Sequence, residues 1–98
     1  MSQIVIVAKM KVKAEYLDEV YQELVTLYTA THANDAGCIQ YDFHKDLEDN
    51  CSFSFVETWE SALLLEKHMQ KEHFLLFVEK CQDKLENLEI NKLEKIKV

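Results

Sequence analysis

The chain has 98 residues, of which 48% are hydrophobic and 10% aromatic, a composition that argues against disorder and fits one domain, residues 1–98, with a small core. Its formal net charge of −7 argues against nucleic acid and anionic membranes as partners, because phosphate groups bind basic surfaces. With one glycine and no proline, the chain has no glycine-rich loop of the kind that cradles phosphate groups.

The three cysteines, Cys38, Cys51 and Cys81, are odd in number, spread along the chain and form no C-x-x-C pair. This pattern predicts neither a disulfide framework nor a zinc site. The first residues lack a basic segment followed by an apolar run, and no stretch is long enough to span a membrane. We therefore expect a cytoplasmic protein in a reducing compartment.

Residues 4–13 are expected to form the first strand. Its first half is apolar on both faces, which is typical of a central strand that is covered on both sides. Residues 15–32 carry apolar side chains at helical spacing and acidic residues in the first turns, a pattern that predicts a helix. Gly37, the only glycine, follows in a polar segment, where a tight turn or a left-handed backbone would end the helix.

Residues 38–44 and 51–59 each show a period of two, with large apolar or aromatic side chains mostly on one face and smaller or polar ones mostly on the other. This pattern predicts a β-hairpin with a polar turn between the strands. In the second of these strands, Glu57 shares one face with the aromatic residues Phe53, Phe55 and Trp59.

Beyond the hairpin the pattern becomes helical, and Ser61 is a suitable N-cap for a helix that extends to about residue 70. A break at 70–72 separates it from a further helix, expected over 73–88. The last segment, 89–98, predicts a fourth strand, and its irregular alternation between Ile90 and Leu93 indicates a bulge or an irregular start.

The order of these elements is β-α-β-β-α-β, with the second helix broken in two. This order predicts a ferredoxin-like α+β fold, in which an antiparallel sheet carries both helices on one face. Val5, Val7 and part of the aromatic set are expected on the other face. Because leaving such side chains in water forfeits hydrophobic stabilisation, we expect that face to pair with a second copy in a C2 homodimer.

Two segments resemble motifs of the antibiotic biosynthesis monooxygenase (ABM) domain family, which includes quinol monooxygenases. Residues 35–38 (Asp-Ala-Gly-Cys) with Tyr41 resemble its "E-P-G-C…Y" segment, although the second position here is alanine. Glu57-x-Trp59 followed by His68 and His73 resembles its "E-x-W…H…H" segment. The resemblance covers nearly the whole chain and implies a dimeric α+β barrel.

The resemblance also implies a cofactor-independent monooxygenase. In this mechanism a base removes a proton from a small aromatic substrate, a phenol or quinol, and the anion reacts directly with oxygen without metal or flavin. The protein supplies an apolar pocket, a base and a hydrogen bond. Because the family also contains isomerases and members of unknown activity, two alternatives stay open: an isomerase that uses the same base without oxygen, and a non-catalytic dimeric ligand-binding module.

His68 is the first candidate for the base or for a hydrogen-bond partner of the substrate. It shares a helical face with Leu64 and Leu65, and an ordinary histidine pKa of about 6.5 suits proton abstraction near neutral pH. The alternative is a core histidine bonded to the backbone or to Glu57. Glu57 would orient His68, raise its basicity or act as a base itself; alternatively, it is a structural carboxylate bonded to a backbone or tryptophan N–H.

Trp59 is a candidate pocket wall or, alternatively, a core or dimer contact. His73 lies near a helix start, where the dipole disfavours its charged form, and is a candidate for substrate binding or for capping. Because His68 and His73 are separated by the helix break and no third ligand is evident, no metal site is predicted. Aromatic residues complete the candidate substrate pocket: Tyr41, Phe43 and Phe55.

Overall fold

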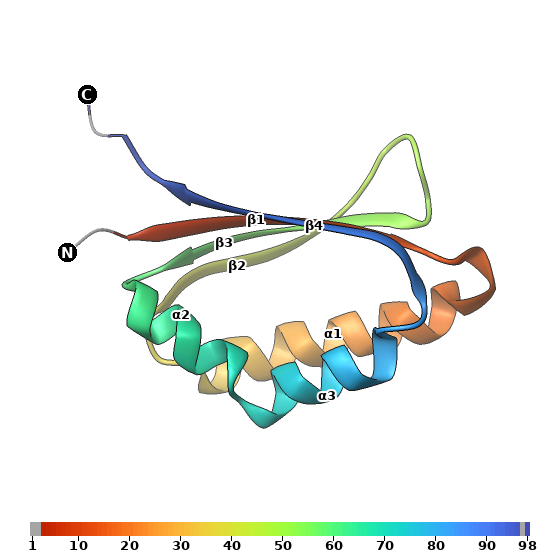
Figure 1. Ribbon diagram of the computed structural model, residues 1–98, viewed down its shortest axis with the longest axis horizontal. Coiled ribbons are helices and arrows are strands. Elements are labelled where there is room, and N and C mark those ends of the chain that lie inside the picture. The colour runs from red at the N-terminus through yellow and green to blue at the C-terminus, as the bar shows by residue number, and fades with distance from the viewer. Residues whose placement is uncertain (1–2, 97) are drawn as a thin grey trace.

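The structure, a computed structural model, describes residues 3–96 and 98 (Figure 1). Its elements follow the order strand, helix, two strands, two helices and strand, with one 3-10 turn before the first helix. Their bounds are β1 Ile4–Val12, η1 Ala14–Tyr16, α1 Leu17–Asn34, β2 Cys38–Lys45, β3 Ser52–Trp59, α2 Ala62–Met69, α3 Glu72–Cys81 and β4 Leu85–Glu94.

The sheet has the strand order β2-β3-β1-β4, and each strand is antiparallel to its neighbours. Figure 1 shows α1, α2 and α3 together on one face of this sheet. The predicted ferredoxin-like α+β fold is therefore confirmed, and its broken second helix corresponds to α2 and α3. No helix in residues 3–96 is both long and apolar enough to cross a membrane.

The core lies between the sheet and the helices, and the period of two along each strand decides which residues enter it. In β3 every second residue from Phe53 to Trp59 is buried, and in β1 the same holds from Ile6 to Val12. α1 contributes Val20, Leu24 and Leu27 at spacings of four and three, so they share the stripe that faces the sheet.

The last helix and last strand differ from their expected bounds. The helix expected over 73–88 ends at Cys81, and the strand expected over 89–98 begins at Leu85 and ends at Glu94. Leu85 continues the helical spacing, but the Lys84 amide bonds to the Cys81 carbonyl and closes a turn there. The free edge of β1 then supplies backbone partners along the whole of β4, which outweigh local helical preference.

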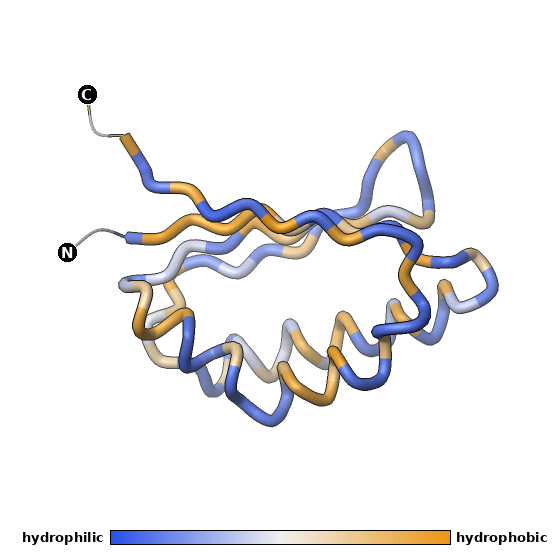
Figure 2. The backbone as a smooth tube through the Cα atoms, viewed as in Figure 1, coloured by the Kyte–Doolittle hydropathy of each residue, from blue (hydrophilic) through white to orange (hydrophobic). Residues whose placement is uncertain are grey.

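The irregular start expected for the last strand is present: Lys11 pairs with Asn87 and Val12 with Leu85, so Glu86 is an extra residue at the start of β4. The pairing is regular between Ile90 and Leu93, so no bulge lies there. From Asn87 to Glu94 the pairing of β4 with β1 is regular. Figure 2 shows apolar and polar residues mixed along β4, without the strict alternation of β3. Of the residues beyond β4, Lys97 lies outside the described residues, whereas Lys95 and Ile96 are not in a strand.

The face of the sheet away from the helices carries Val5, Val7 and Val56, all half-buried, among mostly polar residues. The aromatic residues expected partly on this face lie on the helix side instead, because they occupy the alternate positions of β2 and β3. The homodimer through this face stays a prediction, with a smaller apolar surface than the sequence suggested.

Candidate active site

A cavity of about 120 Å³ lies between the sheet and the helices α2 and α3. Most of its walls are aliphatic and aromatic side chains from β1, α1, α2, α3 and β4. Few polar residues reach it: Tyr41, Glu57, His68 and Lys92. A small apolar space with a few polar groups is the usual form of a small-molecule site.

His68 points from α2 into this cavity because Leu65, three residues earlier, anchors the same face of the helix in the core. Ser61 fixes the start of α2, since its hydroxyl accepts a hydrogen bond from the Leu64 amide at 3.3 Å. The imidazole is 2% exposed. Its ring centroid lies 4.6 Å from that of Trp59 and 5.1 Å from that of Phe74, so its orientation is held by packing.

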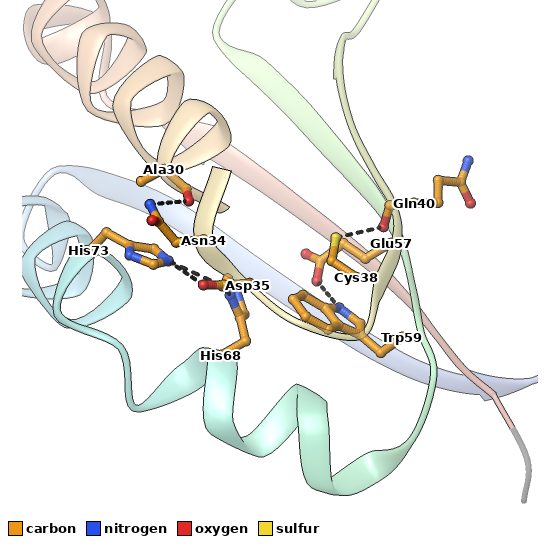
Figure 3. Close-up of polar contacts among 9 residues, drawn as sticks. All are labelled: Ala30, Asn34, Asp35, Cys38, Gln40, Glu57, Trp59, His68 and His73. Carbon is orange, nitrogen blue, oxygen red and sulfur yellow. Dashed lines mark hydrogen bonds and ion pairs between the residues drawn. The ribbon is translucent and has the colours of Figure 1, made fainter. Parts of the chain in front are cut away.

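Asp35, between α1 and β2, holds the two histidines together (Figure 3). Its side chain is 1% exposed, and its carboxylate bonds to Nδ1 of His68 and, at 3.1 Å, to Nε2 of His73. Because an ionised carboxylate only accepts hydrogen bonds, Nδ1 of His68 carries the proton in this pair. The lone pair of the neutral imidazole is then on Nε2, the ring nitrogen left for a ligand.

Two opposing influences act on the pKa of His68. Burial lowers this pKa, because desolvation disfavours the imidazolium, and the hydrogen bond and charge of Asp35 oppose the effect. The net direction is downward, so the imidazole is neutral at pH 7 and able to accept a proton at Nε2.

Glu57 reaches the cavity from β3. The indole Nε1 of Trp59 donates a hydrogen bond to its Oε1 at 2.9 Å (Figure 3). Burial raises the pKa of Glu57 to about 7, and the bond from Trp59 opposes this rise. Glu57 therefore exchanges its proton near neutral pH, whereas the carboxylate that orients His68 is Asp35.

The other expected pocket residues divide into two groups. Tyr41 and Phe55 line the cavity, and burial with the nearby Glu57 charge raises the pKa of the Tyr41 hydroxyl, which stays protonated. Trp59, His73 and Phe43 lie behind this lining. Trp59 holds Glu57, His73 holds Asp35, and Phe43 stacks on Phe55 with ring centroids 5.0 Å apart.

Asp35 is the site residue that sequence reasoning missed, although it belongs to a recognised motif segment. The donor atoms of Asp35, His68 and His73 lie within 4.8 Å of one another, so the third possible metal ligand that seemed absent in the sequence is present. We call these three residues the Asp35–His68–His73 cluster.

Comparison with known proteins identifies the family. Residues 3–80 match the sequence pattern of the antibiotic biosynthesis monooxygenase family, and the chain belongs to this family. The expected resemblance is thus confirmed.

Uncharacterized protein sll1783 of Synechocystis sp. is 34% identical over 82 residues, which are 84% of this chain and 55% of that protein. This chain therefore spans little more than half of that relative's length. The crystal structure of PA3566 from Pseudomonas aeruginosa is 30% identical with a TM-score of 0.91, covering 99% of this chain and 97% of that one. A crystal structure of an antibiotic biosynthesis monooxygenase, 23% identical with a TM-score of 0.90, covers 96% of this chain and 99% of its own and shows the shared fold.

Proposed function

We propose that this protein is a cofactor-independent monooxygenase that oxidises a small phenol or quinol in the cavity beside His68. One observation carries the proposal: a buried, neutral imidazole lines an apolar cavity and is held by a buried carboxylate. A base oriented by a carboxylate is a recurrent arrangement in proton-transfer catalysis. Family membership supports oxygenase chemistry, and it leaves substrate and mechanism open.

In the proposed reaction, Nε2 of His68 accepts the proton of the substrate hydroxyl, and Asp35 stabilises the imidazolium that forms. The phenolate transfers electrons to dioxygen, and a carbon–oxygen bond forms to give a hydroperoxide. Loss of water then breaks the oxygen–oxygen bond and leaves a carbonyl group. One oxygen atom enters the product and the other leaves as water, and the substrate supplies all four electrons.

The size of the cavity restricts the substrate. An apolar space of about 150 Å³ accommodates benzene. The cavity of about 120 Å³ is somewhat smaller, so it limits the substrate to a single aromatic ring that extends partly into the opening. Glu57 and the protonated hydroxyl of Tyr41 provide the polar groups that would orient this ring from the sheet side. The activity would belong to a homodimer formed through the opposite sheet face, which leaves the cavity free.

Oxygen consumption with a panel of single-ring quinols tests the proposal. We expect uptake by the chelator-treated protein, incorporation of one ¹⁸O atom from ¹⁸O₂, and a loss of at least about 100-fold in kcat for His68→Gln. His44→Gln is the matched control, because His44 is an exposed histidine of β2 outside the cavity. Equal activity of wild type and His68→Gln would remove His68 from the mechanism.

One observation favours a second candidate, an isomerase. Glu57, with a pKa of about 7, and the neutral His68 line the same cavity, and two such groups suit removal of a proton from one carbon and its return to another. Turnover of an enolisable substrate without oxygen uptake would identify this activity. Binding of a quinol with neither uptake nor turnover would identify a non-catalytic ligand-binding module.

A further inference from the structure

Three separate elements bring their donor atoms to one point in the Asp35–His68–His73 cluster. Asp35 follows α1, His68 belongs to the last turn of α2, and His73 lies in the first turn of α3. Figure 3 shows both imidazoles directed at the same carboxylate. Two imidazoles and one carboxylate are side chains that bind metal ions in proteins, and here they meet at one largely buried point.

The carboxylate of Asp35 lacks a full set of partners. Its side chain is 1% exposed, and Oδ1 accepts no hydrogen bond from the described residues, although it lies 3.1 Å from Nε2 of His73, which bonds to Oδ2. No lysine or arginine pairs with it in residues 3–96 either, since its ion-pair contacts are with His68 and His73 alone. Buried charges in proteins are paired with opposite charges or bound to metal ions.

We propose that a carboxylate oxygen of Asp35, Nδ1 of His68 and Nε2 of His73 bind one divalent transition-metal ion of the zinc type. Two imidazole nitrogens and one carboxylate oxygen are donors that zinc accepts, and three protein ligands leave a coordination position open. The donor atoms lie within 4.8 Å of one another. An ion among them satisfies the unpaired oxygen of Asp35 and neutralises its charge. His73, 16% exposed, is the ligand nearest to solvent and marks the side of entry.

Metal binding changes the chemistry of the cavity as well. A neutral imidazole that binds metal through Nδ1 carries its proton on Nε2. The ring nitrogen offered to the cavity thereby changes from a proton acceptor to a hydrogen-bond donor. The metal-loaded protein therefore lacks the base that the proposed oxygenase reaction requires, and the metal acts as a reversible inhibitor of that reaction.

Calorimetric titration of the intact, chelator-treated protein with ZnCl₂ tests the site without any substrate. We expect one ion per chain, and Co²⁺ in its place should give a visible absorption spectrum of a low-coordinate site. Asp35→Asn and His73→Gln should each weaken the affinity by at least about 100-fold. His44→Gln and Cys51→Ser are controls for exposed histidine and accessible thiol, and both should bind as the wild type does.

Absence of stoichiometric binding, or wild-type affinity in both cluster variants, overturns the proposal. Circular dichroism establishes that each variant is folded, and if Asp35→Asn is not, His73→Gln decides the matter because His73 is the least buried ligand. Because the readout is binding, a protein that binds zinc but oxidises no quinol supports the metal site and counts only against the oxygenase.

Discussion

The cavity has a sheet wall, which presents Glu57 and Tyr41, and a helix wall, which presents His68 with Asp35 behind it. On the sheet wall, strand register places the polar groups, because Glu57 is paired with Ile6 on one side and with Tyr41 on the other. On the helix wall, a loop residue and two short helices are held to one another by side chains. The sheet wall therefore rests on many backbone bonds, whereas the helix wall depends on a few contacts.

The two walls also differ in the partners of their buried carboxylates. Glu57 accepts one hydrogen bond from a neutral indole, and burial raises its pKa to about 7. Asp35 is bonded to two imidazoles. Each wall thus combines one buried carboxylate with nitrogen donors, but only the helix wall offers imidazoles, which can either accept a proton or bind a metal.

Gly37→Ala should have the largest effect, because it displaces the helix wall and leaves the strand ladder intact. Gly37 has φ of 81°, and an added Cβ would clash with Cδ1 of Leu64 and lie 2.9 Å from its Cβ. Backbone strain and overpacking together predict a loss of about 4 kcal/mol in the free energy of unfolding. Urea denaturation measures it, with Ala36→Ser at the neighbouring exposed position as control. A loss below about 1 kcal/mol would show that α2 is not fixed at this contact.

Glu57→Gln should sharpen the description of the sheet wall through pH dependence. The folded-state pKa of Glu57 is raised from 4.5 to about 7, so the wild type has the full contribution of this group below pH 4.5. That contribution is lost as the pH rises through about 7, and it amounts to about 3 kcal/mol. Glutamine keeps an oxygen for the indole of Trp59 and does not titrate. The free energy of unfolding of Glu57→Gln, relative to that of the wild type, should therefore increase between pH 5 and pH 8 in urea denaturation. A difference that stays constant with pH would contradict the raised pKa.

The contrast between the walls also explains what the sequence predicted. Alternation along residues 51–59 places Glu57 among aromatic residues, and helical spacing places His68 beside Leu65, so both could be assigned to the interior. Asp35 follows no period: it lies in a polar turn, 33 residues from His68, and reads as a solvated acid. The end of α3 was ambiguous for another reason, since Leu85 and Leu88 suit a helix as well as a strand, and only pairing with β1 decides between them.

Asp35→Asn should destabilise the helix wall by a smaller amount, about 2 kcal/mol, because hydrogen bonds from two imidazoles to a charged acceptor are replaced by bonds to a neutral amide. The exposed Asp83→Asn, with the same change of charge, is the control. Urea denaturation gives the loss, and ¹⁵N NMR of the imidazoles reports the tautomer of His68. We expect the Nε2–H tautomer to increase in the variant; an unchanged tautomer would mean that Asp35 does not orient the ring.

Phe43→Leu should have the smallest effect, because Phe43 supports the sheet wall from outside the cavity. Its ring stacks on Phe55 with an interplanar angle of 16°, and Phe55 rather than Phe43 lines the cavity. Because Phe43→Leu removes this aromatic pair, we expect a decrease of about 1 kcal/mol in the free energy of unfolding. Binding of phenol, followed by NMR, should be unchanged in Phe43→Leu and altered in Phe55→Leu, which changes the lining itself. Equal changes in phenol binding by the two variants would show that the two rings shape the cavity as one unit.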